Sequence, residues 1–113
     1  MPENQDLAVG QAVYYPFEKA VGLIYETYTF VDGPGERPCV SLLLSDGRDI
    51  GGFNADEADR YLLSLGNTGL DYRFQNVGQL AADYGRGVFA EAFHNAHVLR
   101  IAHELAMAPP PPR

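Results

Sequence analysis

The sequence has little of several things that proteins use for covalent stability or for export. Among its 113 residues there is one cysteine, Cys39, so an internal disulfide bond is excluded, which fits a reducing compartment. Residues 1–6 carry no basic segment followed by an apolar one, so we expect no secretory signal. No apolar run approaches the roughly 20 residues that span a bilayer. We therefore expect a soluble, cytoplasmic protein.

Basic residues are also scarce: there are 8 of them against 15 acidic residues, and Lys19 is the only lysine. The net charge of −7 argues against direct binding of nucleic acid, which relies on basic patches. Such charge could instead mimic a phosphate backbone. The densest acidic cluster, however, is only Asp56, Glu57 and Asp59. We interpret the charge chiefly as a source of solubility.

The chain does contain enough apolar material for a core. Hydrophobic residues make up 46% of it, an ordinary share for a globular domain, and its length is a common domain size. No internal repeat and no long linker divides it. The sequence predicts a single domain over 1–113 with flexible tails at 1–8 and 108–113, the second of which ends in prolines and an arginine.

The first half of the chain has the pattern of β-structure. β-branched and aromatic residues, separated by turn-forming residues, predict strands at 9–15, 21–31, 39–44 and 48–53. The Ser-Asp-Gly-Arg run at 45–48 is typical of a hairpin turn, because glycine readily takes a positive φ.

The second half changes to a helical period. Asn54 followed by Glu57 is a capping-box pattern, and it predicts a helix that Gly66 ends. Alternation predicts a fifth strand at 70–74, followed by a short helix and then a long helix over 88–107. The order β-β-β-β-α-β-α-α favours an α+β fold, in which two to three helices pack on one face of an antiparallel sheet.

Residues 9–53 also resemble small SH3-like barrels. The resemblance rests on Gly10 before Val13-Tyr14-Tyr15, on Gly22 before Ile24, and on Val40–Leu44 followed by Asp46-Gly47-Arg48. Strands in those barrels are short, and a tight Asp-Gly hairpin is common in them. The resemblance implies an alternative fold, a small barrel with a C-terminal helical extension.

The sequence assembles no recognisable catalytic, cofactor or metal set. Glu91, His94 and His97 follow one another at about one helical turn, a spacing that zinc and di-iron sites use. No second Glu-x-x-His helix and no His-Glu-x-x-His motif accompanies them. Cys39 lacks the flanking signature of a nucleophile, so we interpret it as structural. We predict a protein that is not an enzyme and that binds no cofactor and no metal.

Tyrosines and the last helix carry the functional prediction. The 21–31 strand has large side chains on both faces, and exposed tyrosine is typical of protein-binding surfaces. The 88–107 helix is apolar on two sides, which implies burial by the protein's own elements or by a partner subunit. We favour self-association, as a homodimer, for that helix. The predicted interaction surface comprises Tyr25, Tyr28, Phe30, His94, His97, Ile101 and Leu105.

These features predict a small, acidic, non-enzymatic protein that binds another protein and regulates it. Short acidic α+β proteins without cofactors often serve as accessory or inhibitor proteins of phages and plasmids, an analogy of size and charge alone. The alternative is a small enzyme or a ligand-binding domain with a pocket lined by Tyr and His. We expect a protein partner and no contact with membranes.

Overall fold

The computed structural model of this chain describes residues 7–33 and 35–107. The elements follow one another as β1 (Gln11–Tyr15), β2 (Ala20–Asp32), β3 (Gly35–Leu44), β4 (Asp49–Asn54), α1 (Ala55–Tyr61), β5 (Leu63–Asn67), α2 (Val77–Gly85) and α3 (Ala90–Met107). The predicted tails, 1–8 and 108–113, lie outside the described residues except for Leu7 and Ala8. No helix in the described ranges has both the length and the apolar character needed to cross a membrane.

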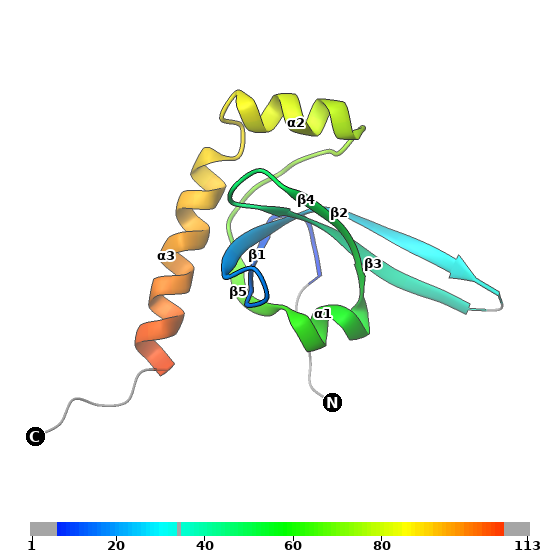
Figure 1. The fold of residues 1–113 in the computed structure, drawn as a ribbon, viewed down its shortest axis with the longest axis horizontal. Helices are drawn as coiled ribbons and strands as arrows, with labels where there is room; N and C mark the ends of the chain where they lie inside the picture. The colour runs from blue at the N-terminus through cyan, green and yellow to red at the C-terminus, as the bar shows by residue number, and fades with distance from the viewer. Residues whose placement is uncertain (1–6, 34, 108–113) are drawn as a thin grey trace, which may run out of the picture.

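The five strands form one antiparallel sheet in the order β4-β3-β2-β1-β5, and three helices pack against it. Figure 1 shows that the sheet is strongly curved and that the far end of the β2–β3 hairpin reaches away from the other elements. The predicted α+β fold with an antiparallel sheet is confirmed.

The SH3-like alternative is wrong, because the sheet is open and not a closed barrel. Its two edge strands, β4 and β5, form no ladder with each other in the described part of the chain. The curvature nevertheless brings side chains of β1 and β4 together: the rings of Tyr15 and Phe53 meet edge to face, with their centroids 5.7 Å apart.

The apolar core lies on both faces of the sheet, because neighbouring strand residues point to opposite sides. One side holds the α2/α3 cluster, which comprises Ala12, Val21, Leu23, Tyr25, Leu43, Leu80, Phe89, Ala92, Phe93 and Ala96. The other side holds the α1 cluster, which comprises Val13, Ile24, Val40, Leu42, Leu44, Ala58 and Leu62. Two of the three helices therefore share a face, and α1 covers the opposite one.

Helix α1 begins as predicted and ends earlier than predicted. Asn54 Oδ1 accepts a hydrogen bond from the Glu57 backbone N–H at 2.8 Å, and Glu57 Oε1 accepts one from the Asn54 N–H at 3.0 Å, which completes the capping box. The helix ends at Tyr61 and not at Gly66, because the residues that follow form β5 and pair with the free edge of β1.

The predicted strand at 70–74 is wrong, since this segment is irregular. β5 already pairs with β1 and forms the edge of the sheet at that place. The alternation nevertheless predicted the correct side chains for packing. Leu70, Tyr72 and Phe74 are partly buried against the α2/α3 cluster.

The last two helices lie close to their predicted positions. Asn76 caps α2 by accepting a hydrogen bond from the Gln79 N–H at 2.8 Å. A turn containing Gly87, whose φ is +83°, separates α2 from α3. The fully buried residues of α3, Ala92, Phe93 and Ala96, lie in its first half. Leu99 and Arg100 extend its contact with the sheet, because Leu99 packs on the α2/α3 cluster and the Arg100 guanidinium lies 4.1 Å from the centre of the Tyr14 ring.

Candidate functional site

The outer part of the β2–β3 hairpin extends beyond its neighbouring strands, and we call residues 26–32 and 35–38 the arm. The β1 ladder reaches β2 only as far as Leu23, and the β4 ladder reaches β3 only as far as Cys39. Both outer edges of the arm therefore lack a strand partner within the described ranges. Its exposed apolar side chains are Tyr28, Phe30 and Val31, which are 39%, 52% and 64% accessible.

The two edges of the arm differ chemically. On the β3 edge Pro38 has no backbone N–H, and proline is a common means of blocking strand addition. The β2 edge contains no proline and runs through Thr27, Thr29 and Val31, which are all β-branched. The β2 edge is thus the one that an additional strand could join.

Tyr25 belongs to the core and not to the predicted interaction surface. Its side chain is 3% exposed, and its ring packs on Phe74 with the centroids 5.0 Å apart. The Tyr25 hydroxyl donates a hydrogen bond of 2.6 Å to Asp49 Oδ1. Burial, together with that bond, raises the pKa of Tyr25 well above its ordinary value of 10.0. The helical elements cover this half of β2, which the strand pattern alone did not reveal.

A second exposed apolar surface follows the outer half of α3. Val98, Ile101 and Leu105 are 51%, 58% and 72% accessible, and spacings of three and four residues place them on one helix face. We call these three residues the α3 ridge. The predicted residues His94 and His97 are also exposed on this helix. The interaction role of these residues stays a prediction.

The histidine spacing is not accompanied by further metal ligands. Across residues 7–33 and 35–107, no group of three or more His, Cys, Asp or Glu side chains is placed to hold a metal ion. Cys39 is buried, and its Sγ donates to the carbonyl oxygen of Arg37 at 3.6 Å. That contact agrees with a packing role for the thiol.

A pocket of about 260 Å³ opens where β1, β4 and α1 come together. We call it the aromatic pocket; its lining consists of Tyr15, Phe17, Gly52, Phe53, Glu57 and Tyr61. The Tyr15 ring lies 6.0 Å from the Phe17 ring at an interplanar angle of 49°, and it meets Phe53 at 80°. Differently oriented ring faces and one carboxylate therefore surround the same space.

Sequence reasoning missed the aromatic pocket. Its rings come from the end of β1, the β1–β2 turn, β4 and α1, and only the curvature of the sheet brings β1 close to β4. The available signal was the crowding of aromatics near the N-terminus, among them Phe17. The Phe17 side chain is 85% exposed, which is unusual for a phenylalanine in a folded domain.

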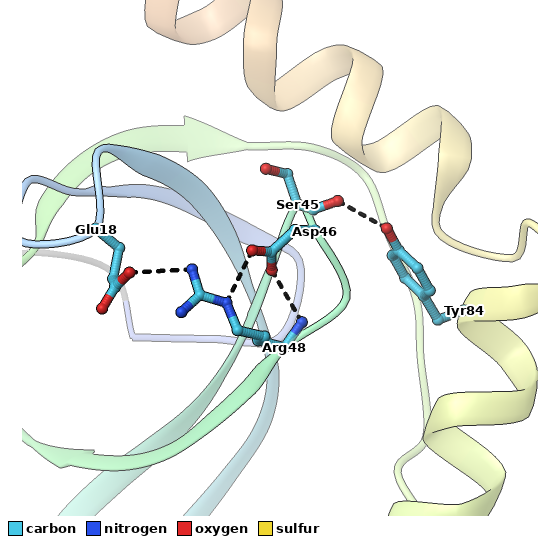
Figure 2. A network of polar contacts seen from close by, with 5 residues as sticks. All are labelled: Glu18, Ser45, Asp46, Arg48 and Tyr84. Carbon is cyan, nitrogen blue, oxygen red and sulfur yellow. Dashed lines mark hydrogen bonds and ion pairs between the residues drawn. The ribbon is translucent and has the colours of Figure 1, made fainter.

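Polar contacts fix the turns at one end of the sheet (Figure 2). Arg48 donates to Asp46 Oδ2 at 2.8 Å and to Glu18 Oε1 at 3.0 Å, so it joins the β3–β4 turn to the β1–β2 turn. Bonds from the Arg48 backbone and side chain lower the pKa of Asp46. The Tyr84 hydroxyl donates to the Ser45 carbonyl oxygen at 2.8 Å and ties α2 to the same turn. These contacts hold the two turns and α2 in place relative to one another.

The buried carboxylate of Asp83 is likewise occupied by structural partners. It accepts hydrogen bonds from the Tyr72 hydroxyl at 2.6 Å and from Gln79 Nε2 at 2.8 Å, and it pairs with Arg86. The bond from Tyr72 is the main cause that lowers the pKa of Asp83, while burial and Asp83 raise the pKa of Tyr72 to about 12. This network holds the 70–74 segment against α2.

Comparison of the chain with protein-family models, with curated proteins and with solved structures finds no significant match. Function must therefore be argued from the arm, the α3 ridge and the aromatic pocket.

Proposed function

We propose that this chain is a non-enzymatic protein-binding protein, and that its arm receives an extended segment of a partner protein along the open edge of β2. The supporting observation is the arm itself. β2 continues past the last residue that pairs with β1, and it carries Phe30 and Val31 into solvent. Tyr28 is half-exposed, and its hydroxyl lies over Gly52 of β4.

Three physical arguments favour strand addition at this edge. An isolated two-stranded ribbon has marginal stability in water, so a third strand would stabilise the arm. An open, apolar strand edge is a ready template for pairing, and natural proteins usually block it. Added strands gain affinity from backbone hydrogen bonds and specificity from neighbouring side chains. Tyr28 and Phe30 lie on the same face of β2. Tyr28 leans toward Gly52 of β4, so Phe30 is the ring on this face that would contact the added segment.

The experiment compares matched substitutions of exposed apolar residues. Val31→Lys places a charge on the β2 edge, and Ile101→Lys places one on the α3 ridge. We expect affinity purification from the native host to recover one partner with the unchanged chain and with Ile101→Lys, and to lose it with Val31→Lys. Equal recovery with Val31→Lys would contradict the proposal, as would repeated purifications that recover no partner. An accessory or inhibitor role would then follow from what the partner does.

A second proposal, self-association through the α3 ridge, is favoured by the row of exposed Val98, Ile101 and Leu105. The occupant would be the ridge of a second copy. Residues 90–107 carry Glu91, Glu104 and Arg100, so this helix contributes a net charge of only −1 to the −7 of the chain. Joining two ridges therefore brings together the less charged parts of two acidic molecules.

Light scattering and sedimentation test this second proposal. We expect a dimer of the unchanged chain at high concentration, and a monomer for Ile101→Lys. A strict monomer of the unchanged chain would contradict it without affecting the proposal for the arm.

A further inference from the structure

We propose that the aromatic pocket binds an organic cation, namely the ammonium or guanidinium head of a lysine or arginine side chain or an alkylated ammonium group. The pocket shares no residue with the arm or with the α3 ridge. The inference therefore stands whether or not the proposed function holds.

The aromatic rings that line the pocket favour a cation. The face of an aromatic ring carries negative electrostatic potential, and several faces around one space attract a cation. Four rings supplied by four different segments line the pocket, and the Tyr15–Phe53 pair holds two of them at 80°. Phe17 and Tyr61 are 85% and 49% exposed, so the core does not account for their positions.

The acidic side chains near the pocket also favour a cation. Glu57 lines the pocket, and only its Oε1 is engaged by the capping box. Asp56 and Asp59 belong to the same short helix, and the whole chain carries −7. The Arg60 guanidinium already lies 5.8 Å from the centre of the Tyr61 ring, within the range of about 6 Å for cation–π contacts. A guanidinium therefore already lies within cation–π distance of one ring of this pocket.

The volume of the pocket suits a small ligand. The cavity of about 260 Å³ is smaller than the roughly 300–1,000 Å³ typical of sites for drug-sized ligands. A single cationic head group with part of its alkyl stem fits such a volume better than a nucleotide or a folded cofactor does. The carboxylate would also repel phosphate groups.

The experiment is a titration of the isotope-labelled chain followed by nuclear magnetic resonance. The probes are the N-acetyl methylamides of lysine, trimethyllysine and arginine, free choline, and the N-acetyl methylamide of norleucine as the neutral match. We expect at least one cation to shift the amide signals of Gly52, Phe53, Glu57 and Tyr61, and to bind about tenfold more tightly than norleucine. Tighter binding of the amino-acid probes would support a protein side chain as the source, and tighter binding of choline a free small molecule.

Three variants separate the contributions. Phe17→Ala removes an exposed ring and should weaken cation binding about tenfold. Glu57→Gln removes the charge but keeps the capping box, because glutamine also serves at that position, and it should weaken binding severalfold. Phe30→Ala, the matched exposed phenylalanine of the arm, should leave binding unchanged. Equal binding of norleucine and the cations, no shift with any probe, or full affinity in both pocket variants would overturn the inference.

Discussion

The inner and outer halves of strand β2 are made of similar residues and have opposite environments. In the inner half, Val21, Leu23 and Ile24 are at most 1% exposed, whereas Phe30 and Val31 in the outer half are 52% and 64% exposed. The inner half contributes to both core clusters, and the outer half contributes to neither. Residue type sets which side chains favour burial, but the elements packed above and below the strand decide which of them are buried.

Helix α3 repeats this contrast. Phe93 and Ala96 are buried against the sheet, while Ile101 and Leu105, one or two turns further on, are 58% and 72% exposed. Both elements therefore start in the core and continue beyond it with apolar side chains. This shared feature is the physical basis for proposing contacts with other proteins at the arm and at the α3 ridge.

Truncation of one aliphatic side chain in each half of β2 should give the largest difference. Leu23→Ala leaves a cavity in the α2/α3 cluster and should lower the free energy of unfolding by about 2–5 kcal/mol. Val31→Ala removes exposed methyl groups and should change it by less than about 0.5 kcal/mol. Urea denaturation of both variants measures this, and equal losses would show that the outer half is also covered.

The two hairpin turns should also respond differently to alanine. Gly47 and Gly33 both have positive φ, +93° and +61°, but a Cβ at Gly47 would lie 2.8 Å from the Tyr84 ring, whereas one at Gly33 would meet no atom of the described residues within 4 Å. Gly47→Ala should cost about 2–3 kcal/mol and Gly33→Ala about 1 kcal/mol, because only the first adds a clash to the backbone strain. A larger loss from Gly33→Ala in thermal or urea unfolding would contradict this view of the arm.

Removing one tyrosine hydroxyl from each half of β2 should give a smaller difference in the free energy of unfolding. Tyr25→Phe deletes the bond to Asp49 and should cost about 1 kcal/mol. Tyr28→Phe, on a side chain that is 39% exposed, should cost less than about 0.5 kcal/mol. Chemical denaturation of the two variants at neutral pH compares them, and the reverse order would place the more important hydroxyl on the arm.

The smallest expected effect is on how the stability of the folded chain depends on alkaline pH. The folded state raises the pKa of Tyr25 above 10.0, so its neutral form contributes stability that is complete below about pH 10 and is lost as pH rises toward the folded pKa. Stability should therefore fall less steeply above about pH 10 in Tyr25→Phe than in the unchanged chain. Urea midpoints measured at several alkaline pH values test this, and parallel slopes would mean that Tyr25 ionises freely in the folded state.

Sequence reasoning succeeded where the signal is local. The caps at Asn54 and Asn76 and the positive φ of Gly47 follow from hydrogen bonds and backbone preferences within a few residues. It failed at β5, because that strand forms on an edge of β1 about fifty residues earlier in the chain. A helix that continued to Gly66 was locally reasonable, but it would have left that edge without a partner.

The candidate interaction residues were likewise only partly predictable from local sequence patterns. Tyr28, Phe30, Ile101 and Leu105 of the predicted surface are exposed, whereas Tyr25 is buried. The interaction role of the exposed residues stays a prediction. Tyr25 and Tyr28 are three residues apart on one strand, so alternation places them on opposite faces, but it does not reveal which of the two other elements cover. The aromatic pocket depends on contacts between Tyr15 and Phe53, which only the curvature of the sheet creates.

By itself, the sequence determined the approximate positions of the first four strands, where the three helices begin and the alternation of side chains along each strand, because hydrogen bonding and periodicity act over short distances. The tertiary structure decided which apolar residues the helices cover, that the sheet stays open, and which aromatic rings meet around one pocket. Those outcomes depend on segments far apart in the chain, whose packing no local pattern encodes.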